Sequence, residues 1–132
     1  MLDQINVFAV LVAAVVTFLL GGLWYSKALF GAVWQRAVGL SDAEAAANPG
    51  RTLGLSFVLS LVGALTFALF LGKEASPAFG AAAGATAGLC WVASSFGINY
   101  LFEKKKLALF LVNGGYHTVQ YTLFGLVLGL WH

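Results

Sequence analysis

The chain has 132 residues, of which 61% are hydrophobic and only 9% are charged. Soluble domains carry about 25% charged residues, so this composition excludes a globular protein dissolved in water. The formal net charge of +2 does not indicate binding to nucleic acid, and we expect membrane lipids as the partners.

Four long apolar segments without a charged side chain fill most of the sequence. They cover residues 5–25, 52–71, 78–100 and 107–131. A hydrocarbon core about 30 Å thick needs about 20 helical residues, and each segment reaches that length. Backbone polar groups in lipid must be bonded within the segment, so each segment is expected to be an α-helix. The sequence therefore predicts an all-α polytopic membrane protein, in which residues 1–132 form a single domain with four transmembrane helices.

The distribution of basic residues predicts the orientation of the helices. An even number of spans places both termini on one side and the connections 26–51 and 101–106 on the other. These two connections carry six of the seven Lys and Arg residues, whereas the opposite side has only Lys73. Because Lys and Arg collect in cytoplasmic loops, both connections are expected in the cytoplasm and both termini outside.

Aromatic and basic side chains flank the segments at the expected depth of the lipid headgroups. Aromatic rings favour this interfacial zone, and four residues are expected there. They are Trp24, Tyr25, Trp34 and Trp131. Lys104, Lys105 and Lys106 form a basic run in the second cytoplasmic connection. We expect this run to contact anionic headgroups.

The connection 26–51 is long enough to hold helices of its own. Apolar residues recur at helical spacing over 29–38, with polar residues elsewhere around the helix. This pattern predicts an amphipathic interfacial helix, lying on the membrane surface in the first cytoplasmic loop. Gly39 is placed to end it. The alternative is that residues 27–38 simply continue the first transmembrane helix.

Local signals mark further helix boundaries. Ser41 and Glu44 match a capping box, which predicts a short helix that begins after Ser41. The pair Pro49-Gly50 is expected to end that helix before the second span. Pro77 suits the start of the third span, because proline is tolerated in the first turn of a helix.

Small residues recur every four positions in the third and fourth segments. Gly80, Gly84 and Gly88 form a doubled GxxxG pattern, and Gly125 and Gly129 repeat the spacing. Small residues let the backbones of membrane helices approach closely. The pattern fits packing inside one four-helix bundle and equally the interface of a homo-oligomer. Because a bundle of this size has little interior, we expect a homo-oligomer.

The fourth segment carries a polar stripe. Asn113, Tyr116, His117, Gln120 and Tyr121 follow one another at intervals that place them on one helix face. His117 lies about 15 Å from the start of the segment, near the middle of the membrane. Such groups are unfavourable against lipid, so this face is expected to look inward or toward a neighbouring subunit.

Other segments offer polar side chains at a matching depth. Ser95 and Asn99 share a face of the third segment, and Ser56 and Ser60 share a face of the second. Together with the stripe, they predict a polar cluster that opens toward the cytoplasm. Cys90, the only cysteine, is expected to be a small buried apolar residue.

The polar cluster has two interpretations. Amides, hydroxyls and a neutral histidine commonly link membrane helices by hydrogen bonds. The alternative is a binding or catalytic site, because five large polar side chains on one face exceed what a small bundle needs. His117 and His132 are the only histidines, and no Asp or Glu lies within a span to orient His117 as a base. We therefore expect neither a metal, nor another cofactor, nor an enzyme.

The sequence points to a non-enzymatic binding or structural module whose polar cluster accepts a lipid or small amphiphile. A small oligomeric channel or carrier is the alternative, and an intramembrane enzyme that uses His117 is a third. A lipid-sized cavity beside His117 favours binding. A continuous polar path to the external side favours transport, and a nucleophile within hydrogen-bond reach of His117 favours the enzyme.

Two runs of aromatic and polar residues carry a family resemblance. The first is Gly-Gly-Leu-Trp-Tyr-Ser at 21–26, followed by Leu-Phe-Gly at 29–31 and Trp34; the second is Asn-Tyr-Leu-Phe-Glu at 99–103, followed by Leu-Val-Asn-Gly-Gly-Tyr-His at 111–117. In these motifs, its length and its number of spans, the chain resembles a small bacterial integral membrane family, the domain of unknown function 1761. Lys27 stands where the family pattern often has a proline. The resemblance implies a four-helix protein of the bacterial inner membrane and implies no activity.

Overall fold

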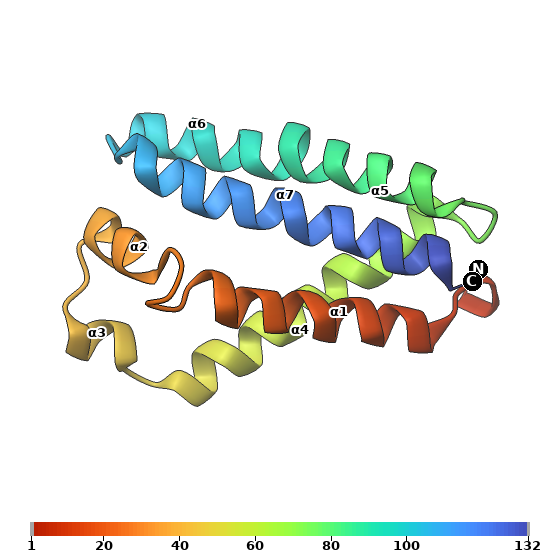
Figure 1. The fold of residues 1–132 in the computed structure, drawn as a ribbon, viewed down its shortest axis with the longest axis horizontal. Coiled ribbons are helices and arrows are strands. Elements are labelled where there is room, and N and C mark those ends of the chain that lie inside the picture. The colour runs from red at the N-terminus through yellow and green to blue at the C-terminus, as the bar shows by residue number, and fades with distance from the viewer. Residues whose placement is uncertain (1, 132) are drawn as a thin grey trace.

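The computed structural model describes residues 2–131, and every regular element among them is a helix (Figure 1). The elements are η1 (Leu2–Gln4), α1 (Val7–Trp24), α2 (Gly31–Val38), α3 (Asp42–Ala46), α4 (Pro49–Leu71), α5 (Pro77–Thr86), η2 (Ala87–Ala93), α6 (Ser94–Phe102) and α7 (Leu107–Leu130). The η2 segment is π-helical and joins α5 to α6 in one continuous helix, Pro77–Phe102, which is the third of the four long helices and is called the third helix, as distinct from α3. The all-α class predicted from the sequence is confirmed.

Three helices are long and apolar enough to cross a membrane, namely α1, α4 and the continuous helix Pro77–Phe102. They match the first three predicted spans to within three residues at each end. The fourth predicted span corresponds to α7, whose 24 residues give it sufficient length. Its polar stripe lowers its mean hydropathy, so α7 does not qualify by composition. Length and composition therefore indicate a membrane protein with three clear spans.

The central helix of the bundle is α7. It packs most extensively along the antiparallel helix formed by α5, η2 and α6, and it packs on its other side against α1 (Figure 1). Helix α4 crosses α1 obliquely and packs on α1 more than on α7. The hydrophobic core lies toward the end of the bundle that holds the chain ends. There Phe124 is completely buried in a cluster that includes Ala13 of α1 and Ala64 of α4.

The glycine pattern brings the third helix and α7 into backbone contact. A Cβ added at Gly80 would overlap the carbonyl group of Gly125. A Cβ added at Gly84 would overlap the carbonyl group of Tyr121, one turn earlier in α7. Gly88 and Gly129 make similar backbone approaches toward the two ends of the contact. The small-residue spacing therefore serves packing within one chain, and it requires no partner subunit.

The π-helical segment changes which residues of the third helix face α7. A regular α-helix would continue the four-residue glycine spacing to Val92 and Phe96. The wider π turn accommodates one more residue, so Ala93 and Gly97 take these positions instead. The Cβ atom of Ala93 lies 3.2 Å from a Cβ placed at Gly114 of α7. Small side chains thus keep the two helices close along their whole length.

The chain turns sharply after α1 instead of continuing the helix. The amide of Phe30 donates to the carbonyl oxygen of Trp24, and the amide of Gly31 donates to that of Ser26. Only glycine fits at the start of α2, because a Cβ at Gly31 would overlap the carbonyl oxygen of Tyr25. The alternative of an uninterrupted first helix is therefore wrong. The separate α2 packs against α7.

The predicted ends of the short helices are largely confirmed. Gly39 ends α2 with φ of +86°. The Ser41 hydroxyl accepts from the amide of Glu44, and the Glu44 carboxylate accepts from the amide of Ser41, both at 3.1 Å. This second bond lowers the pKa of the Glu44 carboxyl. Pro77 begins α5, as predicted.

One predicted boundary is wrong. Pro49-Gly50 does not end the short helix, because α3 already ends at Ala46 and Pro49 is the first residue of α4. The fixed φ of proline and its missing N–H suit the first helical position. Asn48 makes the turn between the two helices in the left-handed region, with φ of +49°.

The two basic connections lie at the same end of the bundle. Helices α2 and α3 and the turn between α6 and α7 gather at one end (Figure 1). Both chain ends and the turn between α4 and α5 lie at the other. This arrangement agrees with the grouping of loops on which the predicted orientation rests. His132 lies outside the described residues.

Candidate functional site

A cavity of about 970 Å³ lies beside the polar stripe of α7. The first half of α4 forms its opposite wall, and α1, α2 and the third helix complete it. Apolar walls come from side chains such as Phe18, Trp34, Leu59, Phe96 and Phe124. Polar side chains also line it, and none of the described lining residues is Asp, Glu, Lys or Arg. The polar lining residues are Tyr25, Thr52, Ser56, Ser60, Asn113, Tyr116, His117, Gln120 and Tyr121.

Most of the predicted polar cluster meets in this cavity. All five residues of the α7 stripe line it, and so do Ser56 and Ser60 of α4. The shared face was predicted from a spacing of three and four residues, which α7 follows as a regular helix. The cavity extends along the parts of α1 and α4 that adjoin the basic connections and along the middle of α7.

Two predicted members of the cluster lie elsewhere. Ser95 and Asn99 are exposed on the outer side of the third helix, away from α7. The Ser95 hydroxyl donates to the carbonyl oxygen of Trp91 in its own helix at 2.7 Å. Both are directed outward because of the π segment, which places Ala93 and Gly97 on the face toward α7. Ser95 and Asn99 each follow one of these residues by two positions, so they point about 200° away from it.

The prediction for Cys90 is also wrong. Its side chain is exposed on the outer face of the third helix. Cys90 follows Gly88, which faces α7, by two residues, so its side chain points away from the bundle. Trp91 beside it is 67% exposed. Neither residue belongs to the cavity.

A chain of polar contacts joins α7 to α4 through His117. The Nδ1 atom of His117 lies 2.7 Å from Oε1 of Gln120. The Nε2 group of Gln120 donates to the hydroxyl oxygen of Ser60 at 3.2 Å. The imidazole ring also stacks almost parallel to Phe96 and Tyr116, with centroids 5.2 and 5.0 Å away. His117 is thus fixed in orientation by two stacked rings and one amide.

Asn113 joins three helices at the end of the cavity nearest the basic connections. The Tyr25 hydroxyl donates to Oδ1 of Asn113 at 2.7 Å. The Nδ2 group of Asn113 donates to the Tyr100 hydroxyl, also at 2.7 Å. One amide side chain therefore ties the end of α1 and the end of α6 to α7.

Two further bonds hold α1 against α7. The indole N–H of Trp24 donates to the carbonyl oxygen of Val112 at 3.0 Å. The Tyr116 hydroxyl donates to the carbonyl oxygen of Thr17 at 2.8 Å. Sequence reasoning placed Trp24 and Tyr25 at the membrane interface and missed these inward bonds. A buried Trp or Tyr needs a polar partner, and that requirement is the signal by which bonds from Trp24 and Tyr25 to the fourth helix could have been predicted.

Three polar groups of the cavity keep free bonding capacity. Within residues 2–131, no hydrogen bond engages the hydroxyls of Ser56 and Tyr121 or the Nε2 atom of His117. No fully buried side-chain nitrogen or oxygen lacks a partner among these residues. The two groups on α7, one turn apart, are therefore accessible. They can accept or donate a bond to a molecule inside the cavity.

The described residues offer no cluster of ligands for a metal ion. No group of three or more His, Cys, Asp or Glu side chains comes together among residues 2–131. His117 itself contacts an amide and two aromatic rings, not a hydroxyl or thiol that it could activate.

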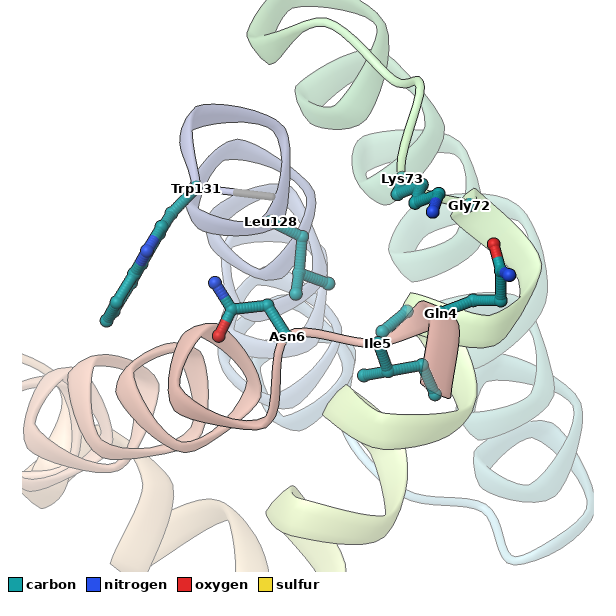
Figure 2. A pocket seen from close by; sticks show the side chains of 8 residues that line it. Gln4, Ile5, Asn6, Gly72, Lys73, Leu128 and Trp131 are labelled. Carbon is teal, nitrogen blue, oxygen red and sulfur yellow. The ribbon is translucent and has the colours of Figure 1, made fainter. Parts of the chain in front are cut away.

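A second, much smaller cavity lies at the opposite end of the bundle. Its volume is about 20 Å³, which is enough for about one water molecule. Figure 2 shows Asn6 and Trp131 on one side of it and Gln4 and Lys73 on the other. Its size excludes a lipid or other organic ligand.

The chain was compared with known proteins. No match was found among curated proteins or among solved structures. Residues 8–129, nearly the whole chain, match the family described as "Protein of unknown function (DUF1761)". The motifs on which the resemblance rested lie within this range. The chain belongs to the DUF1761 family.

Proposed function

We propose that this protein is a four-span membrane protein that binds a lipid or small amphiphile without transforming it. The observation that carries the proposal is the cavity of about 970 Å³ beside His117. Ligand sites typically measure about 300–1,000 Å³ and combine apolar walls with a few placed polar groups. This cavity has that size and that composition.

The proposal requires α7 to cross the membrane as the fourth span. Two observations support this. Helix α7 packs between α1 and the helix Pro77–Phe102, and this position beside two apolar spans supports a path through the bilayer alongside them. Its polar residues also face the cavity and neighbouring helices, where they avoid lipid. With four spans, the charge bias favours cytoplasmic basic connections and external termini, and the family resemblance favours the bacterial inner membrane.

Linking of helices alone does not account for the polar stripe. Gln120 and Asn113 do join neighbouring helices, as structural hydrogen bonds would. His117 and Tyr121, however, retain accessible groups without a protein partner among residues 2–131. Polar groups at this depth are unfavourable unless they are bonded. A ligand with a polar head supplies the missing partner.

The two other functions have less support. A channel needs a polar path to the external side, but the core beyond the cavity includes apolar residues such as Ala13, Phe67 and Leu128. An enzyme needs a nucleophile or an acid beside His117, whose bonded partner is the amide of Gln120. We propose in addition that the protein forms a homo-oligomer. We also propose that anionic lipid headgroups contact the exposed Lys104, Lys105 and Lys106.

Filling the cavity tests this function. Ser56→Trp places a large ring in the cavity wall of α4, whereas Thr66→Trp adds the same ring to an exposed site on the same helix outside the cavity. Both variants and the wild type are purified in a mild detergent, and the retained lipids are quantified per protein by mass spectrometry. We expect Ser56→Trp to lose most of the retained amphiphile and Thr66→Trp to keep it. Equal retention by both variants contradicts the proposed function.

A further inference from the structure

We infer that the cavity selects an uncharged amphiphile whose head carries a hydroxyl group, and that this hydroxyl donates a hydrogen bond to Nε2 of His117. The inference rests on the proposed function and specifies the class of ligand. It follows from the hydrogen-bond network around His117, from the free hydroxyl of Tyr121 and from the lack of charged residues in the described lining.

The network assigns the proton on the imidazole. Because Nε2 of Gln120 donates to Ser60, its Oε1 atom is the one that faces His117. A carbonyl oxygen only accepts, so Nδ1 of His117 must carry the hydrogen of that 2.7 Å contact. In a neutral ring the other nitrogen, Nε2, then carries a lone pair. The free Nε2 atom of His117 is therefore a hydrogen-bond acceptor.

Tyr121 provides a second point of recognition one turn further along α7. Its ring is held by edge-to-face contacts with Phe67 and Phe124. Its hydroxyl can donate and accept. A head with a hydroxyl group satisfies both His117 and Tyr121, because one such group donates to Nε2 and a hydroxyl or ether oxygen accepts from the phenol. A head without a donor leaves Nε2 unpaired.

The charge of the lining excludes ionic heads. No Lys, Arg, Asp or Glu is among the described residues that line the cavity. Arg51 precedes the lining residue Thr52, but it lies about 13 Å along α4 from Ser60. A phosphate or ammonium at the level of His117 would be desolvated without a counter-ion, which is strongly unfavourable. An uncharged head avoids this penalty.

Four amphiphiles with the same monounsaturated chain test the inference. Their heads are glycerol, glycerol with both free hydroxyls methylated, a phosphate monoester and a primary ammonium. The wild-type protein in phosphatidylcholine nanodiscs is exposed to each, and the fraction of protein that carries the probe is measured by native mass spectrometry. We expect the glycerol head to be retained at least about tenfold better than the other three, from the loss of a bond or the burial of a charge.

The outcomes separate this inference from the function on which it rests. Equal retention of all four probes, or preference for the phosphate or the ammonium, overturns the inference while amphiphile binding stands. Retention of none of the probes overturns both. Preference for the methylated head shows that Nε2 is not the recognised group and also overturns the inference.

Two variants locate the recognition at the assigned atoms. His117→Phe keeps a flat ring that can stack with Phe96 and Tyr116 but removes the acceptor, so the preference for glycerol over its methylated form should vanish. Tyr121→Phe removes only a hydroxyl and should reduce glycerol retention roughly fivefold. The control is Thr118→Val, whose hydroxyl already bonds to the carbonyl oxygen of Gly114 in its own helix. Wild-type preference in both variants contradicts the assignment.

Discussion

At the scale of single residues, His117 is the group on which the account depends. Two aromatic rings and one amide fix its orientation, so its second nitrogen has a defined position beside the cavity. Its Nδ1 atom bonds to Gln120, which links α7 to α4, and its Nε2 atom can bond to a ligand. The two roles are separable because they use different nitrogens of one ring.

Substituting His117 separates stability from binding. In His117→Gln an amide can still hydrogen-bond at this position, so the melting temperature should remain close to that of the wild type. His117→Leu leaves Gln120 without this partner and should lower the free energy of unfolding by about 1 kcal/mol. Both variants should lose retained amphiphile, because neither presents the ring nitrogen. Melting temperature and retained lipid are measured together for each.

The same measurement can contradict both roles. Two variants that match the wild type in melting temperature and in retained amphiphile would show that the polar stripe is unused. Thr118→Val provides the reference for a neighbouring polar substitution whose hydroxyl bonds only within its own helix.

At the scale of elements, the π-helical η2 segment decides which side chains reach the site. Sequence reasoning assumed a constant rotation of about 100° per residue along the third helix. That assumption placed Ser95 and Asn99 in the cluster, whereas the wider turn sends them outward and brings Gly97 and Tyr100 to α7. Nothing in the composition of residues 87–93 marks a π turn, so this part of the site could not be predicted.

Deleting one residue from the π segment should be tolerated. Without Leu89, an exposed residue, an α-helical turn can join Gly88 to Ala93 with both still facing α7. Ala82 is also exposed, but it lies within the regular helix α5. Its deletion rotates one of the glycines of α5 away from α7 by about 100°. We expect a folded protein with retained amphiphile from the first deletion and loss of folded protein from the second. Circular dichroism melts provide the comparison, and equal stability of the two deletions would contradict the role given to the π turn.

The contact of α5 with α7 can be tested at Gly84. In Gly84→Leu the new side chain collides with the backbone of α7 at Tyr121, and overpacking of this kind destabilises by about 1–3 kcal/mol or more. Gly54→Leu is the matched control, because a Cβ at Gly54 meets nothing within 4 Å. We expect a lower melting temperature for Gly84→Leu alone. Wild-type stability of Gly84→Leu would mean that this face does not contact α7.

At the scale of the whole molecule, the hydrophobic pattern predicts most of the fold. Each long helix lies within a few residues of a predicted apolar segment, because the segments are bounded by charge, glycine or proline. The oblique course of α4 was not predicted, since uniform apolar sequence does not specify a crossing angle. The cavity depends on that course, so its residues on α7 were predictable and its volume was not.

The orientation of the bundle follows from charge and can be measured by labelling. In a Cys90→Ser background, Ala45→Cys marks the end with α3 and Glu74→Cys marks the opposite end. With basic connections in the cytoplasm, only Glu74→Cys should react with a membrane-impermeant maleimide in intact cells. Both should react after the cells are permeabilised. Reaction of Ala45→Cys in intact cells would reverse the orientation.

Whether an amphiphile occupies the cavity can be measured by photochemical cross-linking. An uncharged amphiphile with a photoreactive group in its chain is incorporated into membranes that contain the protein, and the adducts are mapped by mass spectrometry. We expect adducts on cavity residues such as Phe18 and Phe96, and their loss in Ser56→Trp. Adducts confined to outward side chains such as Trp91 and Phe102, unchanged in Ser56→Trp, would show that the molecule remains in the surrounding lipid and would contradict the account.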